Sequence, residues 1–92
     1  METLYFESID ELLEYSKERL KARITFDYKK TSVNNARLHR LNKGHLHNIL
    51  RILKEKDEVY NTYPMYWYML RKELEFRTII KQLNLPIKTN IL

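Results

Sequence analysis

The side chains with the greatest capacity for chemistry lie close together in this sequence. All three histidines of the 92-residue chain fall between Tyr28 and Leu53, a segment with six lysines and arginines but no aspartate or glutamate. Imidazole groups can ligate metals or transfer protons, and together with guanidinium and ammonium groups they can contact phosphate. Because no acid neutralises the segment, its cations favour contact with a negatively charged partner.

The spacing of the histidines does not suit a metal site. On a helix, His45 and His47 would point about 200° apart and could not share one ion. His39 is too far away in the pattern to complete such a site. The chain has no cysteine, which excludes cysteine-based zinc sites and disulfide bonds. We therefore expect no bound metal.

A catalytic site is equally hard to assemble from this sequence. Catalysis requires a nucleophile, a base and an orienting group that converge, and no such set is apparent. No cysteine can act as a nucleophile, and a single glycine cannot form a glycine-rich phosphate loop. The sequence predicts a protein that is not an enzyme and that needs no cofactor.

Charge is strongly segregated along the chain. The first 14 residues carry five acids and no base, whereas residues 15–53 carry ten bases and two acids, within a net charge of +5. Part of this polarity suits a helix near the N-terminus, since acids are favourable at the start of a helix and bases near its end. The remaining positive charge favours phosphate backbones or acidic protein surfaces as partners.

Composition indicates one small helical domain. A chain of 92 residues has room for a single core, and 43% of these residues are apolar. One glycine and two prolines leave little material for turns, which favours long helices with short joints. We expect a mainly α fold, with residues 1–92 forming one compact bundle of about four helices. The alternative is an α+β fold with a small two- or three-stranded sheet.

No segment predicts a signal peptide or a transmembrane helix. Met1–Asp10 lacks the basic start and the apolar run of a signal peptide. The longest uncharged run, Val59–Leu70, is too short and too polar to cross a bilayer. We expect a small cytoplasmic protein.

Hydrophobic spacing and capping residues delimit four predicted helices, at about residues 9–23, 31–43, 45–61 and 64–83. Ser8 and Glu11 form a capping box at the start of the first helix. Gly44 falls where the second helix should end, and Pro64 suits the first turn of the fourth.

Residues 24–28 fit two structures. Ile24, Phe26 and Tyr28 alternate with polar residues, which is typical of a short strand. Segments Thr3–Phe6 and Ile87–Ile91 could supply partner strands. Ile24 and Tyr28 also continue the apolar face of the first helix, and the bundle without a sheet remains the leading prediction.

Residues 35–51 resemble a helix-turn-helix motif. Ala36, Leu41, Leu46 and Ile49 occupy positions where that motif needs a small residue, an apolar turn residue and two apolar anchors. The resemblance implies a small DNA-binding regulator whose second helix enters the major groove of duplex DNA. Base edges would then be contacted by His45, His47, Asn48 and Arg51, and phosphates by Arg37, Arg40, Lys43 and Lys54.

The segment departs from the motif in three places. Arg40 stands where the turn usually has glycine, and Asn35 and His39 occupy positions that are normally apolar. The structural alternative is an ordinary corner between two helices, capped at Gly44, with its basic side chains in water.

A dense aromatic patch follows, formed by Tyr60, Tyr63, Tyr66, Trp67 and Tyr68. Three consecutive aromatic residues on a helix cannot all face one core, because successive positions are about 100° apart. The patch predicts an interface for a protein partner or for a second copy of the chain. The alternative function is thus a small interaction module, such as an inhibitor or adaptor. Its partner would be a protein with an acidic surface or a second copy of the chain.

Two other roles are open to parts of the patch. For Trp67 alone, a place in the core is favoured over an interface. Single-stranded bases could stack on the aromatic rings beside Arg71 and Lys72, but Glu73 and Glu75 follow directly and oppose a polyanion.

Overall fold

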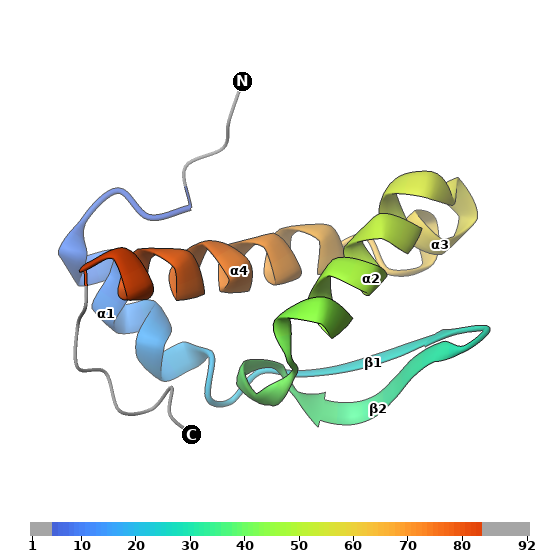
Figure 1. Cartoon of the computed structure of the whole chain (residues 1–92), viewed down its shortest axis with the longest axis horizontal. Coiled ribbons are helices and arrows are strands. Elements are labelled where there is room, and N and C mark those ends of the chain that lie inside the picture. The colour runs from blue at the N-terminus through green and yellow to red at the C-terminus, as the bar shows by residue number, and fades with distance from the viewer. Residues whose placement is uncertain (1–4, 84–92) are drawn as a thin grey trace.

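The computed structural model describes residues 5–83, and Figure 1 shows their arrangement. In chain order the elements are α1 (Ile9–Glu18), β1 (Arg23–Tyr28), β2 (Thr31–Arg37), the 3-10 helix η1 (Leu38–Arg40), α2 (Lys43–Glu55), α3 (Asp57–Thr62) and α4 (Tyr66–Leu83). The described residues are mostly helical with a small antiparallel sheet of two strands. This is compatible with the α+β alternative, whereas a bundle of helices alone is not what forms.

Helix α1 begins as predicted but ends early. The hydroxyl of Ser8 accepts from the backbone N–H of Glu11 at 3.2 Å, and the Glu11 carboxylate accepts from the N–H of Glu7 at 2.7 Å. The helix ends at Glu18 rather than at about residue 23, because the chain from Arg23 onward joins the sheet.

The predicted second helix, at residues 31–43, is wrong. Residues 31–37 instead form β2, which pairs antiparallel with β1 from Tyr28↔Thr31 to Arg23↔Arg37. A bulge opposite Thr25 brings Asn35 into the left-handed region at φ 51°, where its N–H donates to the Thr25 hydroxyl at 2.9 Å. Asparagine adopts this left-handed conformation more readily than most residues do. A residue in this conformation cannot be part of a right-handed α-helix.

The strand that pairs with β1 is β2, and not either of the two segments that the sequence offered as partners. Residues 87–91 and residues 3 and 4 lie outside the described residues, and Tyr5 and Phe6 are not part of a strand. β1 buries Ile24 and Phe26 on one face and exposes Arg23, Thr25 and Asp27 on the other, as its alternating pattern indicates.

Helix α2 begins just before Gly44, so the prediction that this glycine ends a helix is also wrong. The side chain of Asn42 accepts from the N–H of His45 at 2.8 Å and caps the helix. The predicted helix at 45–61 is broken at Lys56, whose extended backbone (ψ 100°) separates α2 from α3. Helix α4 covers most of the last predicted helix, but it begins at Tyr66, so the prediction that Pro64 lies in its first turn is wrong.

Helix α4 runs along the molecule and organises two apolar clusters (Figure 1). Its N-terminal half packs with α2, α3 and the buried face of the sheet around Phe26, Leu46, Ile49 and Leu70. Its C-terminal half packs against α1. There the cluster consists of Leu12, Tyr15, Phe76 and Ile80.

A buried polar network ties α1 to α4. Glu73 is fully buried, and its carboxylate accepts from Arg19 Nε at 2.9 Å, Arg77 Nε at 2.7 Å and the Tyr15 hydroxyl at 2.9 Å. Arg77 also donates to the carbonyl of Leu38 at 3.3 Å, which connects the network to η1. The pKa of Tyr15 is raised, mainly by burial and to a smaller extent by the negative charge of Glu73.

Candidate functional site

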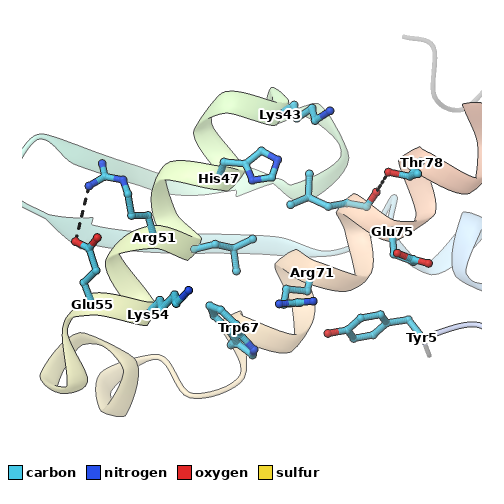
Figure 2. A pocket seen from close by; sticks show the side chains of 12 residues that line it. Tyr5, Lys43, His47, Arg51, Lys54, Glu55, Trp67, Arg71, Glu75 and Thr78 are labelled. Carbon is cyan, nitrogen blue, oxygen red and sulfur yellow. Dashed lines mark hydrogen bonds and ion pairs between the residues drawn. The ribbon is translucent and has the colours of Figure 1, made fainter. Parts of the chain in front are cut away.

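A groove with a volume of about 700 Å³ lies between α2 and α4 (Figure 2). Its lining comes from both helices and from the segment before α1. The lining residues are Tyr5, Lys43, His47, Leu50, Arg51, Lys54, Glu55, Trp67, Arg71, Leu74, Glu75 and Thr78.

One wall of the groove is the basic face of α2. Lys43, His47, Arg51 and Lys54 are all exposed and follow one another at intervals of four, four and three residues, which places them on one side of a helix. The apolar residues of α2 form a separate stripe that packs into the core, which leaves Lys43, His47, Arg51 and Lys54 facing outward. The residues of the apolar stripe are Leu46, Ile49, Leu50, Ile52 and Leu53.

The remaining residues predicted to contact DNA do not line this groove. Arg37 and Arg40 are exposed at the end of β2 and in η1, and Asn48 is exposed on α2. His45 is half-buried, and its backbone N–H is used in the cap of α2. The structure thus brings together four of the eight predicted residues, namely Lys43, His47, Arg51 and Lys54.

The helix-turn-helix motif predicted at residues 35–51 is absent. Residues 35–37 end β2 and residues 38–40 form a single 3-10 turn, so only the second helix of the motif exists, as α2. Without a first helix to cross the DNA backbone, the docking geometry of that motif cannot be reproduced.

The opposite wall, on α4, adds a cation from outside the predicted basic segment. Arg71 is exposed, and its Cζ lies 5.3 Å from the centroid of the Trp67 ring. Trp67 and Arg71 are four residues apart on one helix, a spacing that predicts this contact. Their proximity to α2 was not predictable, because it depends on how the two helices pack.

The floor of the groove is apolar and its rim carries net positive charge. Leu50 is buried, and Leu74 and Trp67 are half-buried against the core. The charged rim consists of four cations, Lys43, Arg51, Lys54 and Arg71, and two carboxylates, Glu55 and Glu75. Arg51 and Glu55 are 3.9 Å apart and more than half exposed, so their attraction is weak and leaves Arg51 able to meet a ligand.

Part of the predicted aromatic interface is used within the protein. The N–H of Thr25 donates to the Tyr66 hydroxyl at 3.0 Å, and that hydroxyl donates to the Thr25 carbonyl at 3.0 Å. The N–H of Asp27 donates to the Tyr63 hydroxyl at 3.3 Å. The two tyrosines therefore satisfy the edge of β1 that faces away from β2, where unpaired backbone groups would otherwise be exposed.

The other aromatic residues of the patch divide between the groove and the surface. Trp67 lines the groove, while Tyr60 and Tyr68 are 39% and 45% exposed. Met65, beside them in sequence, is 63% exposed.

His39 lies apart from the groove, in a smaller hollow beside Arg77 and Lys81. Its Nδ1 is buried and has no hydrogen-bond partner among the described residues. Burial lowers the pKa of His39, and the nearby positive charges of Arg19, Arg40 and Arg37 lower it further.

The chain matches no protein-family model, no curated protein and no solved structure. Within residues 5–83, no three histidine, aspartate or glutamate side chains gather closely enough to hold a metal ion. None of the helices described is both long enough and apolar enough to cross a membrane.

Proposed function

We propose that this protein is a small DNA-binding protein, without enzymatic activity, that contacts its ligand through the groove between α2 and α4. The observation that carries the proposal is the convergence of Lys43, Arg51 and Lys54 from one helix with Arg71 from another. Cations arranged in this way neutralise phosphates and release the counterions around them, which is the main source of non-specific affinity for nucleic acid.

The mode of binding differs from the one implied by the helix-turn-helix resemblance. Phosphate contacts position a protein on DNA but carry no sequence information of their own. The exposed Arg40 lies just before α2 and close in sequence to Lys43, and it would extend the basic surface beyond the start of the helix. We therefore expect binding dominated by charge, with weak discrimination among sequences.

The proposal predicts a characteristic dependence on salt. Each neutralised phosphate contributes a slope of about −0.7 to −0.9 in a plot of log K against log salt. Four rim cations therefore predict a slope of roughly −3 to −4. Fluorescence anisotropy of labelled oligonucleotides, measured at several salt concentrations, would give this value.

A matched pair of charge reversals tests whether the groove is responsible. Lys43→Glu combined with Lys54→Glu should abolish binding, because both side chains line the groove. Lys17→Glu combined with Lys21→Glu changes the net charge equally at exposed positions outside it and should weaken binding only slightly. Equal losses in the two variants, or no binding by the unaltered protein at low salt, would contradict the proposal.

A second function, as a protein-interaction module, is favoured by the exposed apolar side chains at the start of α4. Met65 and Tyr68 are 63% and 45% exposed, and Tyr60 on α3 is 39% exposed. Exposed aromatic and methionine side chains are common anchors of protein interfaces. Tyr60→Ser combined with Tyr68→Ser should remove self-association measured by sedimentation while leaving DNA binding intact. A monomeric protein before substitution would count against a homodimer.

A further inference from the structure

We propose that the groove between α2 and α4 takes single-stranded nucleic acid, with an unpaired base stacked at Trp67 and Arg71 and the flanking phosphates held by the cations of α2. This inference rests on the proposed function, since it specifies the form of nucleic acid that the same site binds. Three features of the groove support it: its shape, its aromatic platform and the placement of its acids.

The shape of the site suits a flexible strand better than a duplex. A duplex is read by an element that projects into one of its grooves, whereas this site is concave and has an apolar floor at Leu50, Leu74 and Trp67. Its volume of about 700 Å³ falls within the range of roughly 300–1,000 Å³ for pockets that enclose organic ligands. Unpaired bases can enter such a hollow and bury their flat faces there.

The aromatic platform is already oriented. Trp67 is half-buried and packs against the main apolar cluster, so its ring loses little freedom when a ligand binds. The Arg71 guanidinium covers the ring, with its Cζ 5.3 Å from the centroid. Bases stack on tryptophan rings and on guanidinium planes alike, so a base could lie on Arg71 or replace it over the ring.

The placement of the acids removes the objection raised by the sequence. Glu73 is fully buried and its charge is met by Arg19 and Arg77, so it does not face the groove. Glu75 does line the groove, but it lies toward the end occupied by Tyr5 and Thr78 (Figure 2).

Glu55, the other carboxylate of the groove, lies beside Arg51, so the charges on either side of the stacking platform are positive. Figure 2 shows Lys54, from α2, and Arg71, from α4, on either side of Trp67. Farther along α2, Arg51 and Lys43 continue the line of cations, and the imidazole of His47 lies between them in sequence. This combination of a basic track with an aromatic ring beside it is the arrangement typical of proteins that bind single strands with little sequence preference.

Trp67 also makes the inference directly measurable, because it is the only tryptophan in the chain. Its emission reports on the groove alone. Titration with an oligo-dT strand should quench this emission, and the strand should bind at least about tenfold more tightly than a duplex of equal length at the same salt concentration.

Substitution separates stacking from simple charge attraction. Trp67→Leu keeps an apolar side chain against the core but removes the aromatic face. It should weaken oligo-dT binding by about 5- to 150-fold in anisotropy measurements, as expected for the loss of one stacked base. Tyr68→Leu is the matched control, since Tyr68 is exposed on the same helix and does not line the groove. This variant should bind as the unaltered protein does.

Each other outcome has a definite meaning. Binding of duplex with equal or greater affinity, without a change in Trp67 emission, would overturn this inference and leave the proposed function standing. Absence of binding to either form at low salt would overturn both. Displacement of oligo-dT by a lower concentration of polyglutamate would overturn the inference in favour of an acidic protein ligand.

The folded state of the tryptophan variant is checked by its thermal transition. Should Trp67→Leu fail to fold, Arg71→Ala, at an exposed position, takes its place and should weaken oligo-dT binding at least about fivefold. Unchanged oligo-dT binding by a folded variant of either kind would overturn the inference.

Discussion

Replacement of Glu73 by glutamine should remove a large part of the stability of this protein. The buried carboxylate accepts hydrogen bonds from Arg19, Arg77 and Tyr15. Glutamine has nearly the same shape but no charge, so Arg19, whose side chain is only 2% exposed, would remain buried beside a neutral group. Removing one partner of a buried ion pair typically costs about 3–5 kcal/mol.

This loss is large on the scale of the whole fold. A chain of 92 residues has a free energy of unfolding on the order of 5–14 kcal/mol. A domain of this size loses about 4–8 °C of melting temperature per kcal/mol. We therefore expect the melting temperature to fall by roughly 12–40 °C, or the chain to be unfolded at room temperature if its stability is at the low end.

Urea denaturation followed by circular dichroism would measure the change in the free energy of unfolding. Glu75→Gln is the matched control, because Glu75 is exposed two positions away on the same helix. Its effect should stay within about 0.5 kcal/mol. A loss for Glu73→Gln below about 1 kcal/mol, the value of an exposed ion pair, would refute the reasoning.

Two further predictions concern groups in unusual environments. The lowered pKa of His39 means that below about pH 6.5 the unfolded chain binds more protons than the folded one, so stability should fall as the pH drops from about 7 to 5. The His39→Gln variant should show a shallower fall in urea titrations, and parallel curves would contradict this. Lys29 has φ 49° in the hairpin turn, a conformation that costs a side chain about 1–2 kcal/mol. Lys29→Gly should therefore raise the free energy of unfolding by about 0.5–1 kcal/mol, and a decrease in thermal melts would show that the turn is not strained.

Local sequence alone determined where α1 begins and which side chains of α2 face away from the core. Ser8 and Glu11 mark the start of α1, and the apolar stripe of α2 places Lys43, His47, Arg51 and Lys54 outside the core. These features follow from neighbours three and four residues apart, so no knowledge of the rest of the fold is needed to predict them.

The sheet could not be predicted from local sequence patterns. Residues 31–37 contain apolar spacing compatible with a helix, but as β2 they satisfy their backbone through hydrogen bonds to β1. The other edge of β1 depends on Tyr63 and Tyr66, whose hydroxyls come from 36 and 41 residues away. A strand has no hydrogen bonds of its own, and therefore its formation depends on partners that local patterns do not identify.

The charge of the groove and its aromatic surface likewise depend on the tertiary structure. In the sequence, Glu73 is an acid beside two cations, whereas in the fold it is buried with Arg19, 54 residues away. Trp67 and Lys54 meet across the groove only because α2 and α4 pack together. Charge and aromaticity are properties of single residues, but the field and the surface that a ligand meets depend on which residues the fold buries and which it brings side by side.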